Sequence, residues 1–88
     1  MKARILNYRI GPKKQYSNQL LVKPEFIESD REASRLIGRR LVLEAKLGRR
    51  ISKFYGRIVA VHGRKGVVVA RMNRGIPGTL IGSIAEIV

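Results

Sequence analysis

The segment that decides the fold runs from Gly56 to Met72 and has the sequence GRIVAVHGRKGVVVARM. Its two β-branched runs, residues 58–61 and 67–70, suit a pleated, half-buried surface. Between them stand Gly63 and Gly66, which can adopt the positive φ angles that a tight connection needs. The segment therefore predicts a β-hairpin with a cationic tip between the two glycines.

The register of this hairpin decides where its basic side chains meet. If Val61 lies opposite Val67, then Arg57 lies opposite Arg71 on the same face of the sheet. Two like charges directly across a ladder repel each other, so this pairing predicts a shared anionic partner. A slip of one residue would instead move these side chains to the other face.

Alternating or β-branched runs elsewhere in the chain predict further strands. A polar loop over residues 13–18 separates the first two, and a turn around Gly48 separates the next two. Gly56 interrupts the longest run, where we expect a bulge or a bend that curls the sheet. The predicted strands are residues 2–10, 19–23, 41–46, 51–61, 67–70 and 80–88.

One short helix is predicted before the third strand. Ser29 and Glu32 have the capping-box spacing, in which Ser29 bonds the amide three residues on and Glu32 reaches back. An apolar face follows and Gly38 supplies the stop. Six or seven short strands and one short helix together predict an all-β fold of one domain over residues 1–88. We expect a small antiparallel barrel with the helix as a lid. The predicted apolar face consists of Ala33, Leu36 and Ile37.

The charge of the chain points to an anionic partner. Nineteen Lys and Arg against six acids give a formal net charge of +13 over 88 residues. Four of the six acids lie within residues 25–32, whereas residues 39–74 hold eleven Lys and Arg and one acid. These cations are interleaved with apolar residues, which places them on the solvent face of folded strands rather than on a basic arm. Because such a charge density destabilises a compact state unless something negative binds, nucleic acid is the expected partner.

Other classes of function lack support in the sequence. There is no Cys and a single histidine, His62, without a neighbouring acid cluster, so no metal site is expected. Residues 63–66 lack the spacing of a phosphate-loop motif, and no paired titratable groups suggest catalysis. We therefore expect no enzyme, no cofactor and no small-molecule substrate. No apolar run approaches the roughly 20 residues that span a bilayer, so no membrane association is expected.

Several short motifs, spread along nearly the whole chain, follow one another in a recognisable order and spacing. They are Glu32-Ala33, Leu36-Ile37-Gly38-Arg39, Gly56-Arg57-Ile58, His62-Gly63, Gly66, Val69-Ala70-Arg71, Pro77-Gly78 and Gly82. Taken together, they resemble an archaeal member of the large-subunit ribosomal protein family known as thirty-five-Ae. The resemblance implies a small barrel like those of translation factors, bound in the cytoplasmic ribosome to large-subunit ribosomal RNA and neighbouring ribosomal proteins, without catalysis. It also implies RNA contacts for the matched polar residues Arg57, His62 and Arg71.

Loop charges add further candidates to these three residues, because Lys and Arg neutralise phosphates. The leading hypothesis is therefore a structural ribosomal protein with a basic RNA-binding surface. If the hairpin tip proves structural, the expected RNA face moves to Lys13, Lys14, Arg49 and Arg50. The full set of predicted RNA-binding residues is Arg9, Lys13, Lys14, Arg57, His62, Arg64, Lys65, Arg71 and Arg74.

The alternative is a free RNA-binding barrel that acts on transfer or single-stranded RNA through a basic groove and stacked aromatic rings. Tyr8 and Tyr16 are able to stack on bases, although a tyrosine near a strand end more often packs in the core or at its rim. Phe54 and Tyr55 are adjacent and must point to opposite faces of a strand. This scarcity of aromatics on one face favours the ribosomal hypothesis.

Overall fold

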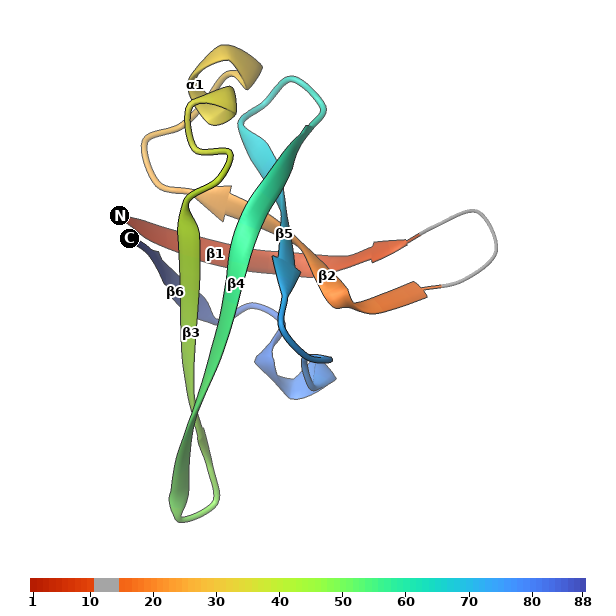
Figure 1. Ribbon diagram of the computed structural model, residues 1–88, viewed down its shortest axis with the longest axis vertical. Helices are drawn as coiled ribbons and strands as arrows, with labels where there is room; N and C mark the ends of the chain where they lie inside the picture. The colour runs from red at the N-terminus through yellow and green to blue at the C-terminus, as the bar shows by residue number, and fades with distance from the viewer. Residues whose placement is uncertain (11–14) are drawn as a thin grey trace.

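The fold is a closed sheet of antiparallel strands. The computed structural model describes residues 1–10 and 15–88. The strands pair in the order β1-β2-β5-β4-β3-β6, and β6 returns to β1 (Figure 1). This topology confirms the predicted all-β barrel, which has six strands and one short α-helix, α1 (Asp30–Ser34). The strands are β1 (Lys2–Ile10), β2 (Gln15–Pro24), β3 (Arg40–Leu47), β4 (Arg50–His62), β5 (Val67–Met72) and β6 (Ile84–Ile87).

Alternate strand positions fill the barrel with apolar side chains. In β3, Leu41 and Leu43 are fully buried, whereas Val42 and Glu44 are not. Burying one such leucine contributes about 1.5–3 kcal/mol. Every buried side chain in the described part of the chain is apolar, so the polar side chains of that part lie at least partly at the surface. Other fully buried side chains include Ile5, Leu20, Val22, Val68 and Ala70.

α1 covers one end of the barrel, and the 3-10 turn η1 (Gly78–Leu80) lies at the other (Figure 1). The Ser29 hydroxyl accepts a hydrogen bond from the Glu32 amide at 3.2 Å, as predicted, and it donates to the Glu32 carboxylate at 3.3 Å. Ala33 and Leu36 are buried in the core. Ile37 is 48% exposed, because α1 has only five residues and helical spacing does not extend that far. The prediction that Ile37 belongs to the buried face is wrong.

Two strand boundaries also differ from the prediction. β2 begins at Gln15 rather than at residue 19, because its first residues pair with the end of β1. β6 begins at Ile84 rather than at residue 80, because Leu80 belongs to η1 and Gly82 has a φ of +93°. An extended run cannot continue through a left-handed residue.

The bulge in β4 is at Val59, not at Gly56. Gly56 lies where β4 leaves β3 and continues along β5, paired with Leu41 on one side and Met72 on the other. A Cβ atom on Gly56 would lie 2.5 Å from Met72 Sδ and 2.6 Å from the carbonyl oxygen of Arg71. Glycine is therefore needed here for close approach of two backbones, not for a bulge.

The register of the β4–β5 hairpin differs from the prediction near its tip. Val61 lies opposite Val68, one residue away from the partner predicted for it. The Val59 bulge then shifts the pairing by one residue, so Arg57 does lie opposite Arg71. The predicted arginine pair is confirmed, although the premise from which it followed is wrong.

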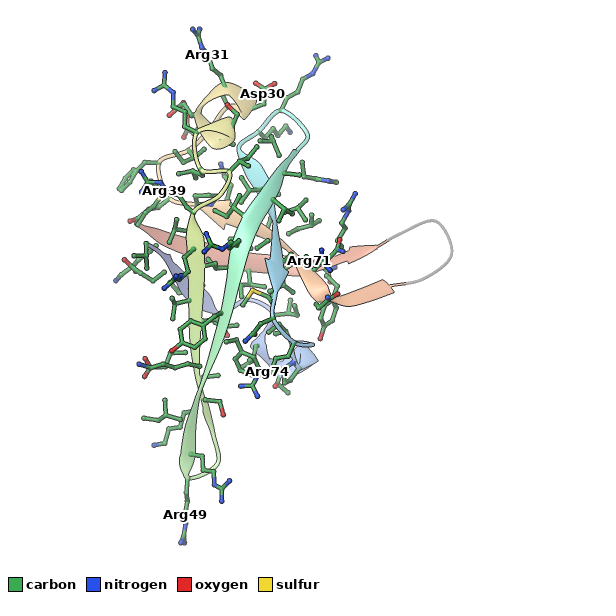
Figure 2. All side chains as sticks on the ribbon, in the orientation of Figure 1. Asp30, Arg31, Arg39, Arg49, Arg71 and Arg74 are labelled. Atoms are coloured by element: carbon green, nitrogen blue, oxygen red, sulfur yellow. The ribbon has the colours of Figure 1, made fainter. Side chains whose placement is uncertain are left out.

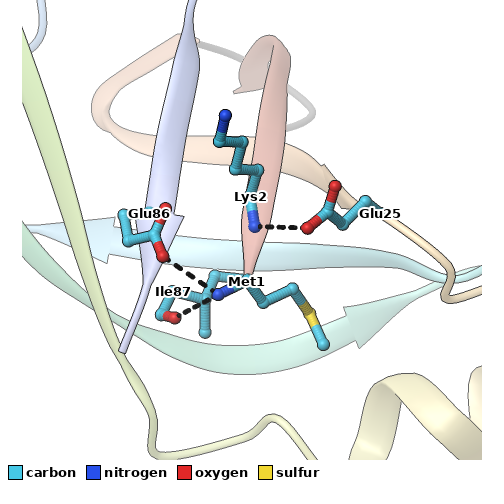
Figure 3. Close-up of polar contacts among 5 residues, drawn as sticks. All are labelled: Met1, Lys2, Glu25, Glu86 and Ile87. Atoms are coloured by element: carbon cyan, nitrogen blue, oxygen red, sulfur yellow. Dashed lines mark hydrogen bonds and ion pairs between the residues drawn. The ribbon is translucent and has the colours of Figure 1, made fainter.

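β1 and β6 close the barrel beside the first residue of the chain. The Met1 amino group donates to the Glu86 carboxylate and to the Ile87 carbonyl, both at 3.1 Å, and the Lys2 amide donates to the Glu25 carboxylate at 3.1 Å (Figure 3). The contact between Met1 and Glu86 is the one ion pair among residues 1–10 and 15–88. The described Lys and Arg side chains are thus left without acidic partners.

Candidate nucleic-acid interface

Three arginines lie side by side on adjacent strands at the outside of the barrel. Arg40 of β3 lies opposite Arg57 of β4, and Arg57 lies opposite Arg71 of β5. All three are exposed, whereas Ile58 and Ala70, their neighbours in sequence, are buried in the core. The three side chains therefore share the outer face. We call Arg40, Arg57 and Arg71 the arginine row; Figure 2 labels Arg71, at its β5 end.

The turn between β3 and β4 places Arg40 in this row. Only two residues, Gly48 and Arg49, separate the paired positions Leu47 and Arg50. Gly48 has a φ of +65°, which a two-residue hairpin turn requires. The pairing then continues without a bulge as far as Arg40.

Two further residues, Gln19 of β2 and Arg9 of β1, lie beside the β5 end of the arginine row. Gln19 of β2 lies opposite Arg71. Arg9 of β1 donates from Nη1 to Gln19 Oε1 at 3.1 Å, which ties its guanidinium to this side of the barrel. The predicted RNA-binding residues Arg9, Arg57 and Arg71 are thus brought together.

The electrostatics of the row are unfavourable in the isolated protein. Residues directly opposite each other on antiparallel strands have Cα atoms about 4.5–5.5 Å apart, and like charges in such positions repel. Arg57 donates one hydrogen bond, from Nη1 to the Gly38 carbonyl at 3.1 Å. A guanidinium has five N–H donors in a planar fork that matches phosphate oxygens, so most donors of the row remain available.

The row borders an open hollow of about 490 Å³. Tyr55 and Val59 line it and are about half exposed. Tyr55 is the one aromatic residue among those lining the hollow. The site thus offers several guanidinium groups and a single stacking surface, an arrangement suited to a sugar-phosphate backbone. The remaining lining residues are Arg40, Arg57, Arg71, Met72 and Asn73.

The other predicted cations of the hairpin, with His62, are not part of the row. Arg64 and Lys65 lie at the hairpin tip, roughly 20 Å along β4 from Arg57 at the usual rise per residue. His62, Arg64 and Lys65 are all exposed. The tip lies at the same end of the molecule as α1 (Figure 1), whose first turn carries Asp30 and Glu32.

The backbone of the tip has a structural task of its own. Gly66 is buried with a φ of +90°, and a Cβ atom there would lie 2.8 Å from the carbonyl carbon of Ile27. Lys23 Nζ donates to the carbonyl oxygens of Ile27 and Lys65, the latter at 2.8 Å. These contacts fasten the tip to the segment between β2 and α1, while the Arg64 and Lys65 side chains stay exposed.

Of the remaining predicted cations, one makes structural contacts, one lies on another surface, and two lie outside the described residues. Arg74 lies with its guanidinium 4.2 Å from the centroid of the Phe54 ring and donates to the Lys53 carbonyl at 3.2 Å. Arg49, at the tip of the β3–β4 hairpin, projects away from the barrel (Figure 2). The predicted residues Lys13 and Lys14 lie outside the described residues.

Arg40 and Gln19 were missed by the sequence analysis. For Arg40 the signal was present, because counting back from a two-residue turn at Gly48 and Arg49 pairs Arg40 with Arg57. No comparable signal existed for Gln19, because the connection between β2 and β5 is long and passes through α1.

The described part of the chain has neither a metal site nor a membrane-spanning helix. It contains no group of three or more His, Cys, Asp or Glu side chains placed to hold a metal ion. None of its helices is long and apolar enough to cross a membrane.

The sequence matches known proteins along its whole length. The family model for ribosomal protein L35Ae matches residues 1–88. Proteins named large ribosomal subunit protein eL33 are similar to the chain: that of Methanopyrus kandleri is 34% identical over 90% of this chain and 86% of the relative. The Aeropyrum pernix protein is 32% identical over 96% and 86%, and the Tetrahymena thermophila protein 31% identical over 99% and 80%.

These matches confirm the family to which the sequence motifs pointed, including its archaeal members. They also confirm that the protein is not an enzyme and that its place is in the cytoplasmic ribosome. The chain belongs to the ribosomal protein L35Ae family and is a structural component of the ribosome.

Proposed function

We propose that the protein binds large-subunit ribosomal RNA through the arginine row, with residues 1–88 acting as one RNA-binding domain. The observation that carries this proposal is the register that sets Arg40, Arg57 and Arg71 directly opposite one another. Strand pairing holds the three charges together although they repel. An RNA phosphate placed among the three guanidinium groups attracts each of them and so offsets their mutual repulsion.

The net charge of +13 supports phosphate contacts as the main source of affinity. Each phosphate that a protein neutralises releases condensed counterions, so the affinity falls steeply with salt. The row and the hairpin tip lie roughly 20 Å apart along the same strands. Two basic sites on one rigid barrel are able to hold two RNA segments at a set distance, which is a structural rather than a catalytic role.

The proposal is tested by comparing two double variants that remove the same charge. Arg57→Gln with Arg71→Gln removes two cations from the row, and Arg31→Gln with Arg35→Gln removes two exposed cations at α1. Affinity for protein-free large-subunit RNA is measured against salt concentration for both. We expect the row variant to flatten the slope of log affinity against log salt by about 1.4–1.8, and the α1 variant to leave it nearly unchanged.

The free proteins are melted on the same preparations. The row variant should melt no lower than the parent, because it relieves repulsion across the ladder. Equal losses of affinity for the two variants would show that only net charge counts. An unchanged slope for the row variant would overturn the proposal.

The alternative function, a free barrel acting on transfer or single-stranded RNA, gains less support. Such binders stack several bases on aromatic side chains, and Tyr55 is the single aromatic in the hollow. Sedimentation of tagged protein through a high-salt gradient separates the two: a ribosomal component stays with the large subunit, and a free binder leaves it.

A further inference from the structure

The outer face of β4 carries an aromatic, a cationic and an aliphatic side chain in succession. They are Tyr55, Arg57 and Val59, and all three line the hollow beside the arginine row. Tyr55 is 44% exposed and Val59 45%, whereas Phe54 and Ile58 are buried in the core. The central arginine of the row therefore stands between two half-exposed apolar side chains.

These apolar side chains have no use in a site for phosphates alone. A regular RNA helix presents phosphates and sugars to a protein surface, because the flat faces of its bases are covered by stacking within the helix. An unpaired nucleotide that leaves the stack exposes the face of its base, which then stacks on an aromatic side chain. The exposed ring of Tyr55 beside the row thus favours an unpaired nucleotide over a regular helix at this site.

The hollow suits one base rather than a series of bases. Tyr55 is the one aromatic among the described residues that line it. The neighbouring Phe54 is buried, and the Arg74 guanidinium lies over its ring at 4.2 Å. The volume of about 490 Å³ falls in the range of about 300–1,000 Å³ that is usual for small-ligand sites. A tract of single-stranded RNA would need several rings in succession, so a single nucleotide fits better.

The charge around Tyr55 suits the phosphate of the same nucleotide. The described lining residues of the hollow include three arginines and no acid. Arg57 follows Tyr55 by two residues, about 7 Å along the strand at the usual rise, and Arg71 lies directly opposite Arg57. The base and the phosphate of one nucleotide are separated by a similar distance. A base stacked on Tyr55 therefore has its own phosphate within reach of two guanidinium groups.

Asn73 adds a hydrogen-bonding group beside the ring. Its backbone amide donates to the Tyr55 carbonyl at 2.8 Å, which holds Asn73 next to Tyr55 just after the end of β5. Its side chain is exposed and lines the same hollow. A side-chain amide has both donors and an acceptor, which match the edge of a base that is no longer paired.

We infer that the hollow receives a single unpaired nucleotide extruded from large-subunit RNA, with its base stacked on Tyr55 and its phosphate bound by Arg57 and Arg71. This inference rests on the proposed function, since it specifies what the arginine row binds. It adds a contact with the face of a base to the contacts with phosphates. The row then prefers a bulge in RNA to a regular helix.

A fluorescent reporter tests the stacking directly. The chain contains no tryptophan, so Tyr55→Trp introduces a single indole at the site. Two synthetic RNA duplexes of the same sequence are added at low salt, one of them with a single unpaired nucleotide inserted. We expect the bulged duplex to quench the indole emission strongly, because the base stacks on the ring, and the regular duplex to leave it nearly unchanged.

Ile84→Trp provides the matched control. Ile84 is 51% exposed on the outer face of β6, so an indole there is similarly accessible but lies outside the hollow. It should respond equally to the two duplexes. Equal quenching of Tyr55→Trp by both duplexes would mean that its ring does not distinguish an unpaired base. That result, or no quenching by either duplex, overturns the inference.

Affinity for protein-free large-subunit RNA separates stacking from charge. Tyr55→Leu keeps an apolar side chain but removes the ring. We expect it to bind roughly tenfold more weakly, with an unchanged slope of log affinity against log salt. Tyr55→Phe restores the ring and should restore the affinity. Unchanged affinity for Tyr55→Leu, or an equal loss for Tyr55→Phe, overturns the inference.

Failure of this inference is distinguishable from failure of the proposed function. The double variant of the row, Arg57→Gln with Arg71→Gln, removes charge and keeps the ring, so the proposed function fails if the salt slope of that variant is unchanged. The nucleotide inference fails if that slope flattens as expected while Tyr55→Leu binds as tightly as the parent.

Discussion

The two ends of the β4–β5 hairpin both carry cations, but they hold them in different ways. At the row, side chains of like charge are forced together by the pairing of three strands. At the tip, the backbone around Gly66 makes the structural contacts, and Arg64 and Lys65 extend into solvent. Removing charge should therefore stabilise the free protein at the row and leave its stability nearly unchanged at the tip.

The largest effect on stability is expected from Gly66→Ala, which tests the backbone role of the tip. The substitution combines a left-handed φ, at about 1–2 kcal/mol, with overpacking against Ile27, at about 1–3 kcal/mol. We expect a loss of about 2–5 kcal/mol in the free energy of unfolding, measured by denaturant titration. Gly48→Ala is the control: its Cβ would meet nothing within 4 Å, so only the first contribution applies. Equal losses for the two would refute the docking of the tip on Ile27.

Arg57→Glu should separate stability from binding at the row. It places a carboxylate between Arg40 and Arg71, which replaces two repulsive cross-strand pairs with two attractive ones. We expect the free protein to gain about 1 kcal/mol, and its affinity for large-subunit RNA to fall further than in Arg57→Gln. Arg64→Glu at the tip, where no cross-strand partner exists, should change stability by less than about 0.5 kcal/mol. A destabilised Arg57→Glu protein would mean that the row is not under repulsion.

Arg74→Lys tests a predicted RNA cation that the structure engages elsewhere. Lysine keeps the charge but loses the planar stacking on Phe54 and the geometry of the bond to the Lys53 carbonyl. We expect a loss of about 0.5–1 kcal/mol in stability with an unchanged salt dependence of RNA binding. Unchanged stability would show that the contacts with Phe54 and the Lys53 carbonyl do not engage Arg74.

The smallest effect on stability is expected from Arg64→Ser combined with Lys65→Ser. Both side chains are exposed, and the Lys65 carbonyl that accepts from Lys23 is retained, so the melting temperature should not fall. If both cations meet phosphates, the salt slope flattens by about 0.7–0.9 for each contact. Lower stability with unchanged RNA binding would show that the tip is purely structural.

Much of the barrel could be predicted from the sequence because its signals are local. Alternating apolar residues such as Leu41, Leu43 and Ala45 define which face of a strand is buried, and a capping serine begins the helix. Boundaries that depend on distant pairing could not be predicted. The early start of β2 requires β1 as its partner, and the exposure of Ile37 depends on where the chain leaves α1.

The candidate site was predicted in part for the same reason. Arg57 and Arg71 stand on one hairpin, so their meeting follows from local register, although the Val59 bulge was not foreseen. Sequence charge alone could not separate the row from Arg64 and Lys65, because all these residues are basic and exposed.

The seam between β1 and β6 has a consequence for the order of folding. It pairs Lys2 with Glu86, residues at opposite ends of the sequence, and closing so long a loop costs conformational entropy before its few hydrogen bonds form. We therefore expect the seam to close last. The arginine row lies on β3, β4 and β5, so it is complete without the seam, and the proposed RNA-binding surface forms in a chain whose barrel is still open.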